Sequence, residues 1–278
     1  MRNRGIYLLM VPGLILIILF LIIPLFLTIV QTFQADGGGF TWGRYLNFFS
    51  SPYLLRIYLR TLKLSLITTM IAVVFGFPTA YYVAKANKNL KAIYTILAVF
   101  PLLTSPVVRS FSWIVVLGKF GLINNALMGL KIIDSPLKLL YNEISVVIGL
   151  VNLFLPLMIM SLIGVMENID QALVEAAESL GASKFKSFLA VVLPLSIPGL
   201  IVGSILVFTG SFTAYTTPQL LGGNKSQLLA TLIYQDAMIL MDWNTAAVIA
   251  TVMIVTTLII SAGINKVTAG QQRKGGLA

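Results

Sequence analysis

The sequence predicts an all-α membrane protein with six transmembrane helices and one helical hairpin outside the bilayer. Of its 278 residues, 58% are hydrophobic and only 10% are charged, whereas about a quarter of the residues in a soluble domain carry a charge. Six apolar runs are long enough to cross a hydrocarbon core, which takes about 20 helical residues. They lie at residues 8–30, 62–84, 94–117, 144–166, 196–217 and 246–265.

The first run follows Arg2 and Arg4, as the apolar region of a secretory signal does. It is too long for such a region and lacks a small-residue cleavage site, so we expect it to stay as an anchor. Residues 40–60 are aromatic and basic, which suits the outer membrane interface. The expected organisation is an anchor with an interfacial segment (1–61), a core (62–266) and a disordered polar tail (267–278).

Five of the six apolar runs contain prolines. A proline frees a helix carbonyl that neighbouring protein or water must satisfy, so the five breaks favour a bundle that moves; the alternative is that prolines are simply common in membrane helices. Gly199 and Gly203 are four residues apart and predict a close contact between two helices. These prolines include Pro24, Pro78, Pro101, Pro106, Pro156 and Pro198.

A soluble-looking segment at residues 167–195, here called the hairpin, separates the fourth and fifth runs. Its first half has the periodicity of an amphipathic helix, with Gln171, Glu175 and Glu178 on the polar face. The predicted apolar face carries Ile169, Leu173, Ala176, Ala177 and Leu180.

Gly181 stands where this first helix should stop, because glycine accepts a left-handed turn at little steric cost. Ser183 can then cap a second helix, and Pro194 is expected to end it. From these residues alone, a helical hairpin lying on the bilayer surface is one interpretation.

Composition excludes several kinds of chemistry. Cysteine and histidine are both absent, which removes disulfides, thiol nucleophiles, imidazole bases and the usual zinc ligands. We therefore expect no catalytic residue, no cofactor and no metal. The net charge of +10 is spread around the ends of the apolar runs and is expected to meet anionic lipid head groups rather than nucleic acid. Lys225 follows Asn224 rather than a glycine, so residues 222–226 do not form a phosphate-binding loop.

Arg109 is a charged residue within the third apolar run. Burying its charge costs several kcal/mol unless it is paired or wetted, which makes Arg109 a candidate for the transport pathway; the alternative is that it reaches the outer head groups. No carboxylate lies deep in any run, which argues against a proton- or sodium-coupled carrier. Further candidates, for which ordinary helix packing is the alternative, are Trp113, Asn152, Thr213 and Tyr215.

Charge bias gives only weak information on orientation, because the basic residues divide almost equally between the two sides. The short turn at residues 85–91 carries three lysines and no acid, and both termini are basic. These features favour cytoplasmic N- and C-termini, which also places the hairpin in the cytoplasm.

The order Glu175-Ala176-Ala177, Gly181 and Leu193-Pro194 resembles the EAA loop of bacterial ABC-importer permeases. In that family the loop is the cytoplasmic element that docks into the ATPase subunit, so the resemblance implies docking by Glu175, Ala176, Ala177, Gly181 and Pro194. It also implies a bacterial inner membrane, a dimer of ATP-binding subunits that hydrolyse the ATP, a second homologous permease subunit, and an extracytoplasmic substrate-binding protein.

Residues 45–61, 101–113, 217–223 and 230–234 look like the branch of this family that serves the polyamines spermidine and putrescine. The expected function is therefore a polyamine permease subunit that alternates access when its ATPase partner acts. Permeases for thiamine, ferric ion and phosphonates are similar and remain alternatives. Two alternatives lie outside this class. One is a non-transporting scaffold whose hairpin binds a cytosolic protein, and the other is a secondary carrier.

Overall fold

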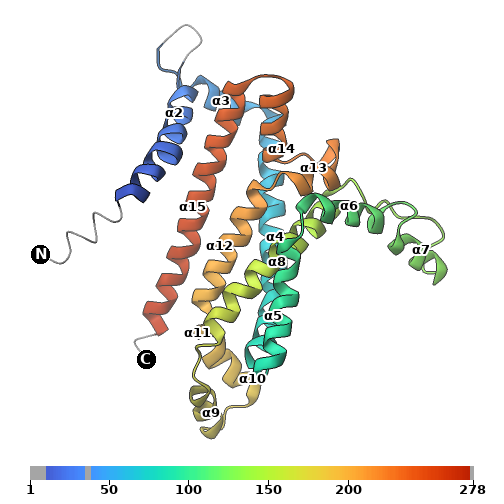
Figure 1. Cartoon of the computed structure of the whole chain (residues 1–278), viewed down its shortest axis with the longest axis vertical. Helices are drawn as coiled ribbons and strands as arrows, with labels where there is room; N and C mark the ends of the chain where they lie inside the picture. Colours follow the sequence, from blue (N-terminus) through green and yellow to red (C-terminus); the bar gives the residue numbers. More distant parts are fainter. Residues whose placement is uncertain (1–10, 35–38, 276–278) are drawn as a thin grey trace, which may run out of the picture. The chain divides into compact units, whose positions relative to one another are not determined.

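The computed structural model describes residues 11–34 and 39–275, with side chains to residue 266 (Figure 1). The regular secondary structure of the described chain is helical, apart from one isolated bridge between Gln34 and Phe40. Six helices in this part are long and apolar enough to cross a membrane, which confirms the predicted all-α, six-span fold. They are Val11–Thr32, Pro52–Lys85, Pro106–Gly129, Glu143–Met166, Lys184–Thr213 and Trp243–Lys266.

The chain divides into two compact units, and the first consists of residues 1–56 and 232–255. Its aromatic side chains cluster around Phe33, whose ring centroid lies 5.2 Å from that of Phe40 and 4.8 Å from that of Trp42. Thr32 and Tyr45 share a hydrogen bond between their hydroxyl groups. The elements of this unit are η1 (Ile18–Ile22), α2 (Ile23–Thr32), α3 (Gly43–Ser50), η4 (Gln235–Ile239) and the first part of α15 (Trp243–Gly275).

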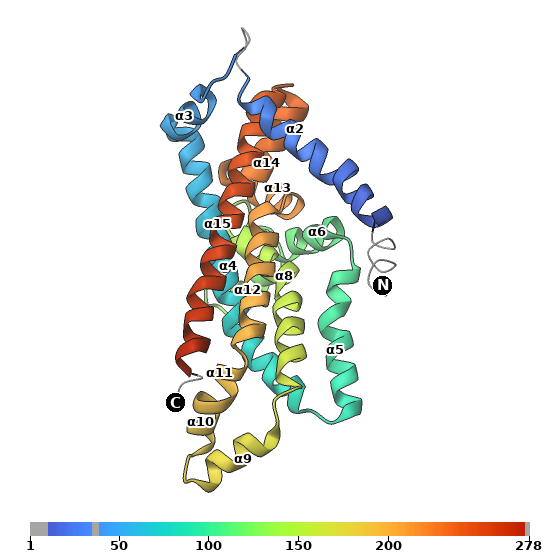
Figure 2. The ribbon, with the colours of Figure 1, turned by 90° about the vertical axis from the view of Figure 1, so that its left-hand side faces the viewer.

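The second unit consists of residues 57–231 and 256–278. Four of its helices run side by side, and α8 packs most extensively on α12 (Figures 1 and 2). Side chains from α4, α8 and α12 form a buried core that includes Ala72, Phe77, Met158, Leu162 and Val207. The four helices are α4 (Pro52–Lys85), α5 (Lys88–Leu103), α8 (Glu143–Met166) and α12 (Ile197–Thr213).

Gly199 and Gly203 bring α12 close to α8. The Ser161 hydroxyl of α8 donates a hydrogen bond to the Gly199 carbonyl at 2.8 Å. A Cβ atom at Gly199 would lie 2.9 Å from the Ser161 carbonyl oxygen, and one at Gly203 would lie 2.6 Å from the Met158 sulfur. The predicted close helix contact is confirmed, because only glycine leaves room for it.

Short helices form the end of this unit that lies away from the hairpin (Figure 2). There α13 packs on both α6 and α8. The segment after α6 is held by Asn124, which is buried; its amide group donates to the Gly118 and Leu137 carbonyls and accepts from the Leu137 N–H. The short helices are α6 (Pro106–Leu117), α7 (Leu122–Gly129), α13 (Thr216–Gly222), η3 (Asn224–Ser226) and α14 (Leu229–Tyr234).

The third predicted span, residues 94–117, is wrong as a single helix. Helix α5 ends at Leu103 and α6 begins at Pro106, with extended backbone at Thr104 and Ser105. The residue before a proline avoids the helical conformation, and the Ser105 hydroxyl caps α6 by accepting from the Val107 N–H at 3.3 Å. Helix α5 packs along α8, whereas α6 lies across the direction of α5 and packs on α13 and α8 (Figure 2).

Helix α15 continues to Gly275, into the segment that the sequence predicts to be disordered. Glutamine, arginine and lysine after residue 270 are good helix formers, so a long apolar helix can extend through them.

Candidate functional site

The hairpin follows the end of α8 and precedes the start of α12 (Figure 2), and its first two helices are α9 (Gln171–Ser179) and α10 (Lys184–Ser187). Each helix has a side-chain cap. The Asp170 carboxylate accepts from the Ala172 N–H at 2.9 Å, and the Ser183 hydroxyl accepts from the Lys186 N–H at 3.4 Å. The predicted cap at Ser183 is confirmed.

Gly181 adopts a left-handed conformation with φ of +91°. Its N–H donates to the Glu178 carbonyl at 2.9 Å, and the Ala182 N–H donates to the Ala177 carbonyl at 3.1 Å. This pair of hydrogen bonds is the Schellman motif that ends many α-helices at a glycine. The predicted turn at Gly181 is therefore confirmed.

The apolar side chains of α9 do not all point toward the bundle. Val174 is the buried one, at 5% exposure, whereas Leu173 is 50% exposed and Leu180 is 91% exposed. Phe185 in α10 is 70% exposed. Most of the predicted apolar face is thus left uncovered by this chain, and we call Leu173, Leu180 and Phe185 the apolar patch of the hairpin.

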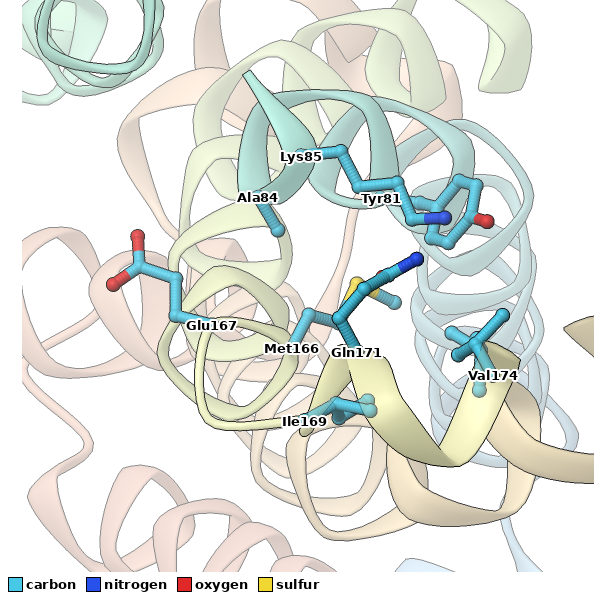
Figure 3. Close-up of a pocket in the computed structure, with 9 residues that line it drawn as sticks. Tyr81, Ala84, Lys85, Met166, Glu167, Ile169, Gln171 and Val174 are labelled. Carbon is cyan, nitrogen blue, oxygen red and sulfur yellow. The ribbon is translucent and has the colours of Figure 1, made fainter. Parts of the chain in front are cut away.

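A cavity of about 440 Å³ separates the base of the hairpin from the ends of α4 and α8 (Figure 3). The side chains of Lys85 and Gln171 extend toward Tyr81, and the Lys85 ammonium lies 4.6 Å from the Tyr81 ring centroid. Glu167 points away from the cavity and pairs with Lys91 at 3.0 Å. The full lining is Tyr81, Ala84, Lys85, Met166, Glu167, Ile169, Gln171, Val174 and Val192.

The second half of the hairpin is fixed to the bundle by Phe188. Its ring makes edge contacts with Phe77 and Tyr81 of α4, at centroid distances of 5.7 and 5.1 Å. Beyond Phe188 the chain remains helical through η2 (Phe188–Val192), α11 (Leu193–Leu195) and α12, and counts as one helix from Lys184 to Thr213.

The prediction that Pro194 ends the second helix is therefore wrong. Proline has no N–H to donate, and its ring clashes with the carbonyl four residues earlier. The π turn just before Pro194 widens the helix there, and the Leu193 N–H bonds to the Phe188 carbonyl, five residues back. The helix accommodates Pro194 in this way and does not stop.

The docking residues implied by the resemblance lie in the hairpin or directly beyond it. Glu175, Ala176 and Pro194 are exposed, and Ala177 is half-buried. Within the described part of the chain, the carboxylates of Glu175 and Glu178 make no hydrogen bond or ion pair. Glu175 is therefore free to meet a group from another molecule.

The pathway candidates lie on separate elements. Arg109, in α6, donates from Nη2 to the Thr104 carbonyl at 2.9 Å, while its Nε and Nη1 are enclosed without a partner among the described residues. The oxygen of the Asn152 amide, in α8, is likewise enclosed and unpaired. Trp113 packs against a small core beside α6, Thr213 is exposed at the end of α12, and Tyr215 is half-buried before α13.

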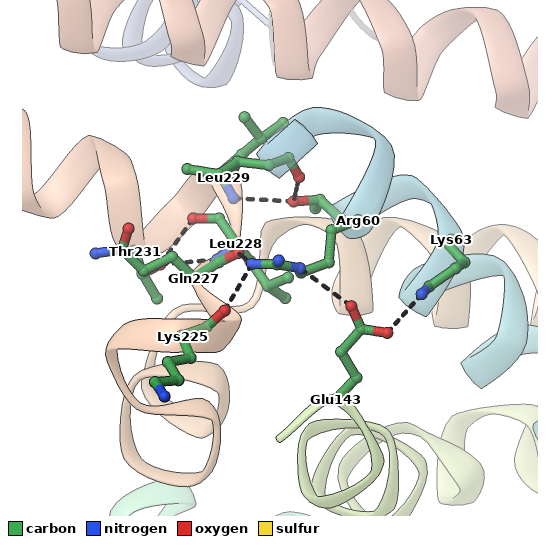
Figure 4. A network of polar contacts seen from close by, with 10 residues as sticks. Arg60, Lys63, Glu143, Lys225, Gln227, Leu228, Leu229 and Thr231 are labelled. Atoms are coloured by element: carbon green, nitrogen blue, oxygen red, sulfur yellow. Dashed lines mark hydrogen bonds and ion pairs between the residues drawn. The ribbon is translucent and has the colours of Figure 1, made fainter. Parts of the chain in front are cut away.

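A polar network that the sequence did not reveal joins α4, α8 and the connection before α14 (Figure 4). Arg60 donates to the Glu143 carboxylate at 3.1 Å and to the Lys225 carbonyl at 3.0 Å, and Lys63 pairs with the other Glu143 oxygen. The Thr61 hydroxyl accepts from the Leu229 N–H at 3.0 Å. Two basic residues three apart near the start of a span, Arg60 and Lys63, were the available signal, which the predictions from sequence did not use.

Asp236, in η4, is a buried carboxylate that sequence reasoning missed. It is 7% exposed, and burial, followed by the negative charge of Asp242, raises its pKa to about 6. Asp242 differs, since hydrogen bonds from Thr245 at the start of α15 lower the pKa of Asp242. Asp236 follows Leu229 and Leu232 by seven and four residues, and this helical spacing on an apolar face was the available signal.

Six membrane helices and a hairpin with an uncovered apolar patch define an integral membrane subunit of a larger assembly. The chain belongs to the family of binding-protein-dependent transport system inner membrane components, whose model matches residues 72–268. The chain is thus a permease component of an ABC importer.

Two relatives and one solved structure agree with this assignment. The spermidine/putrescine transport system permease protein PotB of Haemophilus influenzae is 34% identical over 233 residues, covering 82% of this chain and 81% of the relative. PotB of Escherichia coli K12 is 32% identical over 196 residues, 70% of this chain and 71% of the relative. A bacterial alginate ABC transporter, solved with an alginate pentasaccharide-bound periplasmic protein, shares the fold with a TM-score of 0.79 at 18% identity, covering 95% and 94% of the two chains.

Proposed function

We propose that this permease component carries polyamines of the spermidine and putrescine class into the cell. The observation that carries the proposal is the 34% identity to a spermidine/putrescine permease over about four fifths of both chains. The alternatives of thiamine, ferric ion or phosphonate have no comparable support. A secondary carrier is disfavoured by the family assignment.

The proposed partners are a dimer of ATP-binding subunits, a second permease subunit and an extracytoplasmic substrate-binding protein. The apolar patch of the hairpin supports the first of these, because large apolar side chains exposed together mark a surface that another molecule covers. The free Glu175 carboxylate lies on the same helix, α9. ATP hydrolysis then takes place in the partner subunits.

A displacement of the hairpin can reach the membrane span through the helical segment Lys184–Thr213, which contains a π turn at Phe188–Val192 and a turn at Ser196. Its first turns belong to the hairpin, and its later turns pack closely on α8 through Gly199 and Gly203. A partner that displaces the hairpin therefore moves α12 directly. This is a physical route by which ATP binding can change access to the pathway.

Transport by the complete complex in lipid vesicles tests the proposed substrate. Vesicles holding ATP inside and the binding protein outside should accumulate radiolabelled spermidine or putrescine, and should not accumulate thiamine, ferric ion or a phosphonate. Uptake of one of those three without polyamine uptake would replace the proposed substrate. A complex that takes up none of them would leave the scaffold as the better interpretation.

Cysteine labelling tests the proposed orientation, in which both termini and the hairpin are cytoplasmic. Asn89, Asn125 and Ser183 are all exposed in this chain, which contains no native cysteine. In intact cells, an impermeant thiol reagent should label a cysteine at position 125 and spare cysteines at positions 89 and 183 until the membrane is opened. Labelling at position 183 from outside would rule out contact between the hairpin and a cytoplasmic ATPase.

Substitution of Gly181 tests the turn without disturbing packing, because no atom lies within 4 Å of the place where a Cβ would stand. The cost is therefore backbone strain, about 1 to 2 kcal/mol for a residue with a Cβ in the left-handed region. Gly181→Val, being β-branched, should reduce ATP-driven uptake more than Gly181→Ala, while both variants insert in the membrane at normal levels. Equal and normal uptake by both would show that the turn geometry does not matter for coupling.

A further inference from the structure

The Asp236 side chain is more than nine-tenths buried and has no partner of its own. Its backbone carbonyl accepts from the Asp242 N–H at 2.8 Å, yet its carboxylate makes no hydrogen bond or ion pair with any residue that the structure describes. The Asp236 oxygens are not among the fully enclosed atoms that lack a partner. The carboxylate is therefore mostly buried but not fully enclosed.

The charges around Asp236 do not balance. Asp242 adds a second negative charge nearby. The Asp242 carboxylate accepts from the backbone N–H and the hydroxyl of Thr245, at 3.0 and 2.6 Å, and it lies within the electrostatic influence of Arg44. These groups offset the charge of Asp242, and none of them bonds to Asp236. One buried carboxylate is thus left without a positive partner.

A buried carboxylate without a countercharge is costly, and it favours either a proton or a bound cation. We propose that Asp236 binds an ammonium group of the transported polyamine, which supplies the missing positive charge through a charge-assisted hydrogen bond. This inference rests on the proposed function, since it names a recognition group for that substrate class. With six spans and cytoplasmic termini, as proposed above, the connection between the last two spans, which contains Asp236, lies on the outer side, where the binding protein delivers substrate.

The pH dependence of transport follows from the raised pKa of Asp236. Near pH 7.5 a carboxyl group with a pKa of about 6 is ionised and attracts an ammonium group. Below pH 6 it is protonated and loses this attraction, so transport by the wild-type complex should fall. Asp242 does not reproduce this change, because the pKa of Asp242 is lowered.

The test compares Asp236→Asn, Asp236→Glu and Asp134→Asn in the complete complex with its binding protein in vesicles. Asp134 is an exposed carboxylate in the loop before α8 and serves as the matched control. At saturating spermidine-loaded binding protein and pH 7.5, Asp236→Asn should lower the maximal uptake rate roughly tenfold, the effect of losing one partly buried charge pair. Asp236→Glu should recover part of the rate, and Asp134→Asn should match the wild type.

The pH dependence of uptake separates ammonium binding by Asp236 from a merely structural role. If Asp236 binds an ammonium group, the uptake rate of the wild type should fall between pH 7.5 and 5.5, whereas that of Asp236→Asn should stay flat after correction for substrate release from the binding protein. Normal uptake by Asp236→Asn, or a pH profile parallel to that of the wild type, overturns the proposal while the polyamine function stands. If the wild-type complex carries another solute and no polyamine, both proposals fail together. If Asp236→Asn does not assemble, the pH profile of Asp236→Glu decides the question. A profile shifted from that of the wild type supports the proposal, and an unshifted profile overturns it.

Discussion

Glu175→Ala is expected to uncouple ATP hydrolysis from uptake, and Glu178→Ala is expected to do much less. Both carboxylates are exposed on α9 and unpaired within the described chain, so this chain alone gives no reason for a difference. The difference arises if Glu175 meets a basic group in a cleft of the ATPase. Removing one partner of such a buried charge pair costs on the order of 2 to 5 kcal/mol.

The two variants form a matched pair for this test. Alanine has a slightly higher helix propensity than glutamate, so a loss in either variant does not come from unfolding of α9. Uptake and ATPase activity would be measured together in reconstituted vesicles, along with retention of the ATPase during purification. Equal, near-normal coupling in both variants would remove Glu175 from the proposed interface.

Gly199→Leu should prevent normal assembly of the helix bundle. A Cβ atom at this position would lie 2.9 Å from the Ser161 backbone oxygen and 3.1 Å from Val165 Cγ2. Because a backbone oxygen cannot rotate away, α12 would have to separate from α8 and lose the hydrogen bond from the Ser161 hydroxyl. Overpacking of this kind typically costs about 1 to 3 kcal/mol, and a leucine adds further atoms beyond the Cβ.

Gly164→Leu provides the control, because Gly164 lies in α8, the helix that Gly199 contacts, and has nothing within 4 Å of its Cβ position. The amount of folded protein in the membrane and its thermal unfolding temperature should fall for Gly199→Leu and stay close to wild type for Gly164→Leu. Equal behaviour of the two variants would show that the contact between α8 and α12 is less close than the structure indicates.

Local sequence signals predicted the hairpin well, because its boundaries depend on chemistry confined to a few residues. A glycine that can adopt positive φ and a serine that can cap a helix act within one turn, so Gly181 and Ser183 were identified from the sequence. The pair Gly199 and Gly203 was also informative, since small residues four apart lie on one face of a helix.

The prolines could not be interpreted individually from the sequence. Pro106 separates two helices, whereas Pro78 and Pro156 lie inside α4 and α8 without ending them. The difference depends on neighbours, because a proline is tolerated wherever adjacent protein satisfies the carbonyl it frees. Pro194 belongs to the second kind, since the π turn before it keeps the helix continuous.

Which face of α9 turns inward also could not be predicted. Hydrophobicity alone placed Leu173 and Leu180 together on a face of the helix, yet the chain buries Val174 and leaves those two leucines exposed. A surface that a partner covers and a surface that the chain itself covers have the same composition. Only the position of α9 at the ends of α4 and α8 shows which of the two kinds of surface each side chain belongs to.

The π turn at Phe188–Val192 also sets the rotational phase of the helix that contains it. Its buried positions Ser187 and Val192 are five residues apart, while Val192, Ser196, Gly199 and Gly203 follow at intervals of four, three and four. In a regular α-helix, one extra residue would rotate every later side chain by about 100°. The wide turn absorbs that residue, so the hairpin and the membrane span present their inward faces along one line. The π turn thus adds one residue to this helix at the hairpin without changing which side chains of the span face α8.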